Sequence, residues 1–151
     1  MKRNLISGLI SFTALILLTA FTQLLTPALP NLKYTPGATL TSNLDTLCRP
    51  GYASSVRNVT TATKTAIWKE YGIALANRPK YVIDHSIPLE DGGANVLANT
   101  WPQLKAESRI KDSLENKSHK LICQHKLPVV YAQKSIAKNW YKFWVSIRKM
   151  N

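Results

Sequence analysis

The chain has 151 residues, enough for one domain of ordinary size. It carries 20 Lys and Arg against 8 Asp and Glu, a formal net charge of +12, and 45% of its residues are hydrophobic. This composition excludes a wholly disordered chain. Two cysteines are too few for a disulfide-dense miniprotein, and no CxxC spacing of a zinc finger is present. A strongly basic surface favours a polyanionic partner, either nucleic acid or an anionic membrane.

Residues 1–30 predict an export signal or a membrane anchor. Lys2 and Arg3 open the chain, and no charged residue follows until Lys33, while most residues from 5 to 25 are apolar. This pattern is typical of a cleavable secretory signal. About 20 apolar residues also suffice to cross a bilayer, so an uncleaved signal-anchor is the alternative. Both interpretations place the rest outside the cytoplasm: in the periplasm, secreted, or attached to the membrane through residues 5–25.

Residues 31–60 contain several Pro, Ser and Thr residues and predict an irregular arm with a turn at Arg49-Pro50-Gly51. Because an exported protein folds in an oxidising compartment, we expect Cys48 in this arm to form a disulfide with Cys123. The stretch from Ala62 to Tyr71 predicts a short helix that stops at Gly72.

The second half of the chain predicts two short strands and two long helices. The β-formers at 81–83 predict a strand that runs into Asp84-His85, and Asp91-Gly92-Gly93 predicts a loop. A second strand is expected at Thr100-Trp101, closed by Pro102. Residues 103–123 contain no Pro or Gly and predict a long helix, and Pro128 suits the first turn of a last helix. The buried stripe of that helix is expected at Val129, Ile136, Trp140, Phe143 and Ile147.

Asp84 and His85 are the residues most suggestive of chemistry. They are followed by the Gly92-Gly93 turn, by the amide Asn99 on the return strand, and by a helix. Adjacent residues on a strand point to opposite sides. One member of the pair could therefore face the helix and hold a metal while the other faces a substrate.

This segment resembles the His-Me finger, or ββα-metal, core of HNH endonucleases. The resemblance is carried by Asp84-His85, Pro88, Gly92-Gly93 and Asn99, with Thr100 where the family has Leu. A larger run, with Trp101-Pro102-Gln103 and Lys111-Asp112 ahead of Glu115-Asn116, looks like a branch of small exported bacterial nucleases, as does Cys48-Arg49-Pro50-Gly51. The resemblance implies an α+β fold, with the ββα-metal core and its flanking helices in a domain of residues 61–151.

The resemblance also implies roles for these residues. His85 would be the general base that takes a proton from the attacking water, and Asn99 would hold the His85 ring. Asp84 would bind one divalent cation, most simply Mg²⁺, which would stabilise charge at phosphorus and on the leaving oxygen. The expected activity is hydrolysis of DNA, with RNA as a second substrate class. We expect little sequence specificity, because no base-reading module is recognisable.

The second metal ligand is where the chain departs from the family pattern. The expected helix position holds Ser108, a poor ligand, so we expect the neighbouring carboxylate of Glu107 to bind the metal instead. An exposed ion pair between Glu107 and Lys111 is the alternative interpretation. Lys111, one helical turn on, and Arg109 are expected to contact a substrate phosphate.

Three lysines of the last helix, Lys134, Lys138 and Lys142, lie four residues apart. They predict either a solvated face or a contact with the nucleic-acid backbone. Two other functions stay open from the sequence. One is a noncatalytic nucleic-acid-binding module, and the other is a membrane-associated basic protein whose last helix lies on anionic lipid.

Overall fold

The structure is a computed structural model that describes residues 26–151. The predicted apolar segment at 5–25 lies outside the described residues. Within 26–151, no helix combines the length and apolar character that crossing a bilayer would require.

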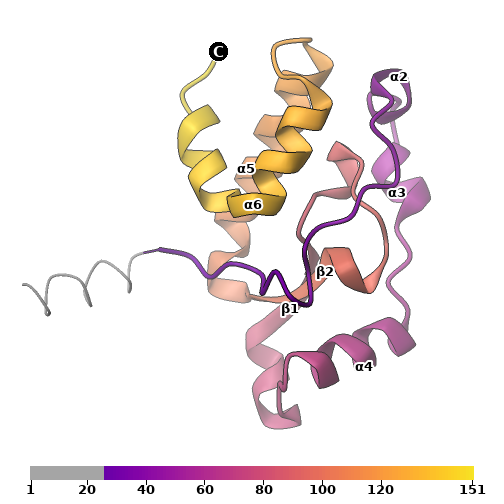
Figure 1. The fold of residues 1–151 in the computed structure, drawn as a ribbon, viewed down its shortest axis with the longest axis vertical. Helices are drawn as coiled ribbons and strands as arrows, with labels where there is room; N and C mark the ends of the chain where they lie inside the picture. The colour runs from indigo at the N-terminus through magenta and orange to yellow at the C-terminus, as the bar shows by residue number, and fades with distance from the viewer. Residues whose placement is uncertain (1–25) are drawn as a thin grey trace, which may run out of the picture.

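The fold is α+β, as predicted, and its centre is a two-stranded antiparallel sheet followed directly by a helix (Figure 1). Strand β1 spans Tyr81–His85 and β2 spans Thr100–Leu104, with Asp84 opposite Trp101. The second strand continues through Pro102, where the sequence predicted its end. A strand of a two-stranded sheet has one unpaired side, so a residue without an N–H is tolerated there.

Helices α5 (Lys105–Cys123) and α6 (Val129–Ile147) form the main apolar core. The predicted stripe of α6 is confirmed at its four buried members, whereas Val129 is only partly buried. At Asn139 the backbone leaves the helical conformation (φ −168°, ψ 93°), so α6 bends there. The Asn139 side chain accepts a hydrogen bond from the Lys142 N–H at 2.8 Å and caps the second half of the helix.

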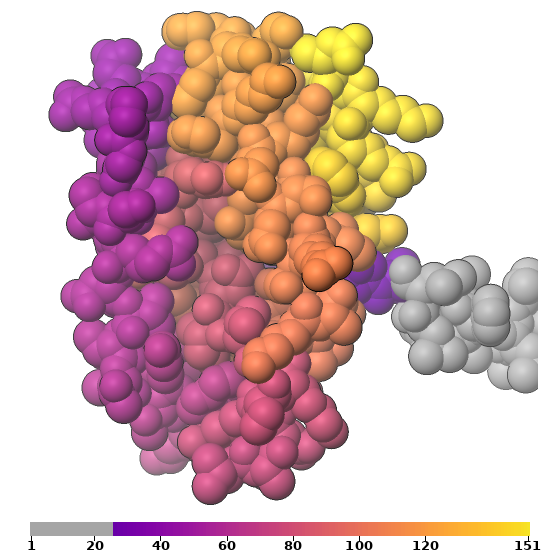
Figure 2. Space-filling model, turned by 180° about the vertical axis from the view of Figure 1, so that it is seen from behind, coloured from indigo at the N-terminus to yellow at the C-terminus, as the bar shows by residue number. Residues whose placement is uncertain are grey.

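The N-terminal arm is more ordered than its composition suggests. It contains the short helices α2 (Leu44–Leu47) and α3 (Tyr52–Val56), separated by the predicted turn, and the predicted short helix follows as α4 (Thr61–Glu70). A 3-10 segment, η1 (Leu75–Lys80), leads into β1. In the space-filling view, the indigo-to-magenta part of the chain covers one flank of the molecule beside the C-terminal helices (Figure 2).

The predicted disulfide between Cys48 and Cys123 is present, with 5.7 Å between the two Cα atoms and a sequence separation of 75 residues. Cys48 follows α2 directly, and Cys123 is the last residue of α5. The bond therefore attaches the arm to the end of the helix that packs beside the sheet.

Replacing both cysteines by serine is expected to lower the free energy of unfolding by about 4 kcal/mol, because the open chain regains the entropy of a long loop. Urea unfolding of the oxidised wild type and the double Ser variant would measure the difference. Wild type treated with reductant is the control and should match the variant. Equal urea midpoints for all three proteins would contradict a stabilising role for the bond.

Candidate active site

Asp84 and His85 are the last two residues of β1, a strand that contacts α5. The His85 side chain is buried, with 3% exposed, and the Asp84 side chain is 23% exposed. Helix α5 begins directly after β2, so its second turn passes along β1. Lys111 in that turn donates a hydrogen bond to the His85 backbone carbonyl at 3.0 Å, and its Nζ lies 3.7 Å from Asp84 Oδ2.

Lys111 is fully buried, and its ammonium also donates to Glu115 Oε1 at 2.8 Å. Burial alone would lower the pKa of this amine, but the carboxylates of Glu115 and Asp84 outweigh burial and raise it. The group is therefore a charged bridge between β1 and α5. The sequence-based role of Lys111 as a surface phosphate contact is corrected, since a side chain with 0% exposure and three oxygen partners is not free to meet a substrate.

Glu107, the predicted second metal ligand, has a different partner. Its Oε2 accepts a hydrogen bond from the Ala28 N–H at 3.0 Å, so it anchors the start of the described chain. Ser108 donates to the backbone carbonyl of Lys105 within its own helix. The carboxylate that shares a partner with Asp84 is Glu115, two helical turns after Glu107. Among residues 26–151, no group of three or more His, Cys, Asp or Glu side chains is arranged to hold a metal.

Asn99 organises the loop between the strands instead of the imidazole. Its side chain is fully buried, accepts from the Ile87 N–H at 2.9 Å, and donates to the carbonyls of Ile87 and Ala94 at 3.0 Å each. The backbone at Gly93 lies so close to that of Ile87 that a Cβ on Gly93 would be 1.9 Å from the Ile87 carbonyl oxygen. The expectation that Asn99 holds the His85 ring is therefore corrected: its amide groups are used to close the loop around Gly93.

The partner of the His85 ring is Asn95, which sequence reasoning missed. His85 Nε2 lies 2.9 Å from Asn95 Oδ1. Burial lowers the pKa of His85, and the Asn95 hydrogen bond and the Asp84 charge offset this only in part. The only sequence signal for Asn95 was its position two residues after the Gly92-Gly93 turn.

Arg57 is a second residue that the sequence did not single out. Its side chain is exposed, and its charge helps to lower the pKa values of both His85 and Glu90. It directly follows α3, on the arm that the disulfide attaches. An exposed guanidinium whose charge acts on the imidazole is suited to bind a phosphate.

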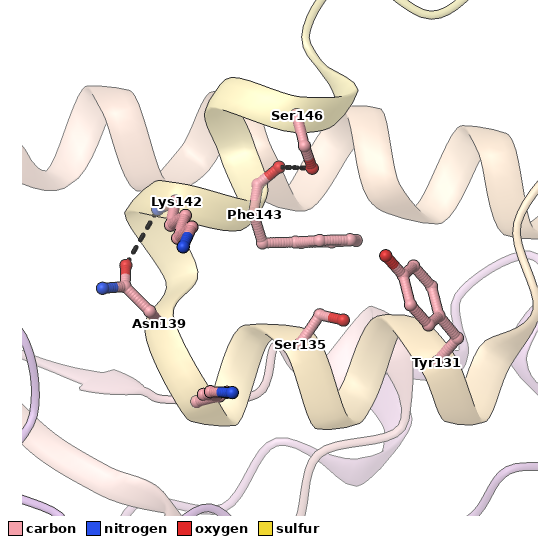
Figure 3. A pocket seen from close by; sticks show the side chains of 7 residues that line it. Tyr131, Ser135, Asn139, Lys142, Phe143 and Ser146 are labelled. Atoms are coloured by element: carbon pink, nitrogen blue, oxygen red, sulfur yellow. Dashed lines mark hydrogen bonds between the residues drawn. The ribbon is translucent and has the colours of Figure 1, made fainter.

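The other predicted nucleic-acid contacts, Arg109, Lys134, Lys138 and Lys142, are all exposed. The three lysines do not line one surface, and the bend of α6 at Asn139 falls between Lys138 and Lys142. Lys138 and Lys142 line a hollow of about 480 Å³ inside the bend, together with Tyr131 and Phe143 (Figure 3). Lys134 lines a different hollow, beside Gly37 and Ile87.

Asp91 is a buried acid that the predicted mechanism does not use. Its side chain is fully buried, neither carboxylate oxygen has a hydrogen bond of good geometry, and His119 Nδ1 lies 4.0 Å away. Burial raises the pKa of Asp91 from 3.8 to about 8, although nearby Ser118 and Lys111 lower it. The carboxyl is therefore protonated in the folded protein at neutral pH.

The chain matches no protein-family model, no curated protein and no solved structure in comparisons with known proteins. What the site can do therefore follows from its own groups: one buried imidazole, two carboxylates that share one ammonium, and exposed cations nearby.

Lys111→Met is expected to destabilise the fold by about 3 kcal/mol, because it leaves two partly buried carboxylates and the His85 carbonyl without their common cation. Chemical unfolding at neutral pH would measure this. The matched control is Lys120→Met on the same helix, where the lysine is exposed, and we expect a change within about 0.5 kcal/mol there. Equal effects of the two substitutions would contradict the bridging role.

Asp91→Asn is expected to flatten the pH dependence of stability. Between pH 3.8 and about 8, folded Asp91 keeps its proton while the unfolded chain has lost it, so rising pH favours unfolding. The wild type should lose up to about 1.4 kcal/mol per pH unit from this group, and the amide variant should not. Free energies of unfolding of both proteins, measured at several pH values in this range, would show the difference in slope. Parallel curves for the two proteins would mean that Asp91 is ionised in the fold.

Proposed function

We propose that the protein is a metal-dependent endonuclease that hydrolyses phosphodiester bonds of DNA, with RNA as a second substrate class. The observation that carries the proposal is the convergence at the end of β1. There an imidazole, His85, stands beside Asp84, and Asp84 shares a buried cation with Glu115 of α5. This agrees with the roles that the resemblance to HNH endonucleases implies for Asp84 and His85.

Asp84 and Glu115 are the pair best suited to hold a divalent cation, in place of the Glu107 that the sequence suggested. Both side chains are about three-quarters buried, at 23% and 22% exposure. Burial raises the pKa of Glu115 to about 7. Above that pH the pair carries two negative charges against the single ammonium of Lys111, which makes it attractive to a further cation. Mg²⁺ prefers one or two carboxylates and completes its shell with water and phosphate oxygens. Such an ion would supply electrostatic stabilisation of the charge that develops on the phosphate.

The residues of the chain then divide the work of hydrolysis. His85 takes one proton from a water molecule as the oxygen of that water forms a bond to phosphorus. The bond from phosphorus to the 3′ oxygen breaks, and the leaving oxygen takes a proton from solvent, which gives 5′-phosphate and 3′-hydroxyl ends. Only a water molecule has to reach the imidazole, so the small exposure of His85 is compatible with this role. Arg57 would hold the phosphate.

The charge of the protein supports binding of a polyanion without base recognition. Of the net charge of +12, only two positive charges belong to the first thirty residues. Exposed cations occur on the arm, on α5 and on α6, at Arg57, Arg109, Lys134, Lys138 and Lys142. Binding that rests on such contacts weakens steeply with salt because it releases counterions.

The test is cleavage of a plasmid by the purified full chain with Mg²⁺ and with EDTA. We expect cleavage only with the metal, and a loss of at least about 10²-fold in His85→Ala, since a general base contributes that much. Glu115→Gln should raise the Mg²⁺ concentration for half-maximal rate by at least about tenfold. Glu107→Gln is the matched control on the same helix and should behave as the wild type.

Thermal unfolding of each variant would separate a lost function from a lost fold. If the folded wild type cleaves neither DNA nor RNA with Mg²⁺, Mn²⁺ or Ca²⁺, the enzyme proposal is overturned. Salt-sensitive DNA binding in that case would point to a noncatalytic binding module, and binding to anionic vesicles to a membrane-associated protein. If Glu107→Gln instead of Glu115→Gln changes the metal requirement, the ligand assignment is overturned.

A further inference from the structure

Asn95 joins three segments that are distant in the sequence. Its Oδ1 lies 2.9 Å from His85 Nε2 and accepts a hydrogen bond from the Asn58 N–H at 3.2 Å. Its Nδ2 donates to the backbone carbonyl of Val56. The arm therefore contacts both ends of the Asn95 amide, through Val56 and Asn58, the two neighbours of Arg57 in the sequence.

The two backbone contacts determine which way the amide points. A backbone N–H can only donate a hydrogen bond, and a backbone carbonyl can only accept one. Rotation of the amide by half a turn would place its NH₂ against the Asn58 N–H and its oxygen against the Val56 carbonyl, two repulsive contacts. The amide oxygen is therefore fixed toward Asn58 and toward the imidazole.

An oxygen fixed in this way also determines the position of a proton on His85. Because Asn95 Oδ1 is an acceptor, the neutral imidazole must carry its hydrogen on Nε2. Among the described residues, no hydrogen bond involves the other ring nitrogen, Nδ1. That nitrogen keeps its lone pair.

We infer that Asn95 is the positioning residue of His85, and that by holding Nε2–H it makes Nδ1 the nitrogen that accepts the proton of the attacking water. The inference rests on the proposed function for the catalytic role of Nδ1, but the position of the proton is a property of the protein without substrate. It assigns to Asn95 the role expected of Asn99, whose amide groups are used by the loop.

His119 is expected to carry its proton on the other ring nitrogen and therefore serves as a control within the same protein. Its Nδ1 lies 2.9 Å from the backbone carbonyl of Glu90, which can only accept, so its hydrogen must be on Nδ1. The same protein should therefore show two tautomers: Nε2–H at His85 and Nδ1–H at His119.

The experiment is a long-range ¹H–¹⁵N spectrum of the imidazole rings in the ¹⁵N-labelled full chain, at a pH where the rings are neutral. The His85→Ala variant assigns the His85 signals. We expect the proton of His85 on Nε2, and that of His119 on Nδ1. A proton of His85 on Nδ1 would overturn the inference whether or not the protein cleaves DNA.

Cleavage kinetics test the positioning role. Asn95→Ala should lower kcat by about 10²-fold with little change in KM, because the ring is no longer held. Asn95→Asp keeps an acceptor oxygen for Nε2 but loses the donor to the Val56 carbonyl, so it should retain the Nε2–H tautomer and recover only part of the rate. Asn77→Ala, at an exposed asparagine whose side chain accepts from Lys80, is the matched control and should behave as the wild type.

The two proposals fail in distinguishable ways. A wild type that does not cleave but shows His85 with Nε2–H overturns the proposed function and leaves the assignment of the tautomer intact. A wild type that cleaves, with Asn95→Ala folded and as fast as the wild type, overturns the positioning role alone. If Asn95→Ala does not fold, the wild-type spectrum and Asn95→Asp still decide the inference.

Discussion

The buried ammonium of Lys111 is the interaction on which the candidate site depends. It donates to the backbone of His85 and to Glu115, and it lies 3.7 Å from Asp84, so one cation connects the end of β1 to α5. A charge without solvent is stable only where its partners are fixed. Lys111 thus requires both carboxylates to face the same point, which is also the arrangement that a divalent cation needs.

A second set of contacts brings the N-terminal arm to the same place. The disulfide holds the arm at the end of α5. Asn95 accepts a hydrogen bond from the Asn58 N–H and donates one to the Val56 carbonyl, which brings the other end of the arm to the imidazole. Arg57 lies between these two residues, so the same contacts hold an exposed cation on the arm segment that meets Asn95. The disulfide and the Asn95 contacts therefore hold two ends of the same stretch of the arm.

Local sequence patterns were enough to predict most helices, strands and turns, and to single out Asp84 and His85 at the end of β1. The alternation from strand to glycine turn to strand to helix was predictable, as were the helix at 62–71, the turn at Arg49-Pro50-Gly51 and the buried stripe of α6. Each depends on residues near one another in the chain. The end of β2 and the bend at Asn139 were not predictable, because strand pairing and packing overrode the local preference there.

The sequence by itself determined the basic charge, the pairing of the two cysteines as an expectation, and the adjacency of Asp84 and His85. Only the tertiary structure decided which side chains surround them. Lys111 was expected at the surface but is buried, and Asn99 was expected at the imidazole but binds the loop. Asn95 and Glu115 contact the site although the sequence assigned no role to either. The physical reason is that a side chain's role depends on which partners satisfy its hydrogen bonds and charge, and these partners come from segments that only folding brings together.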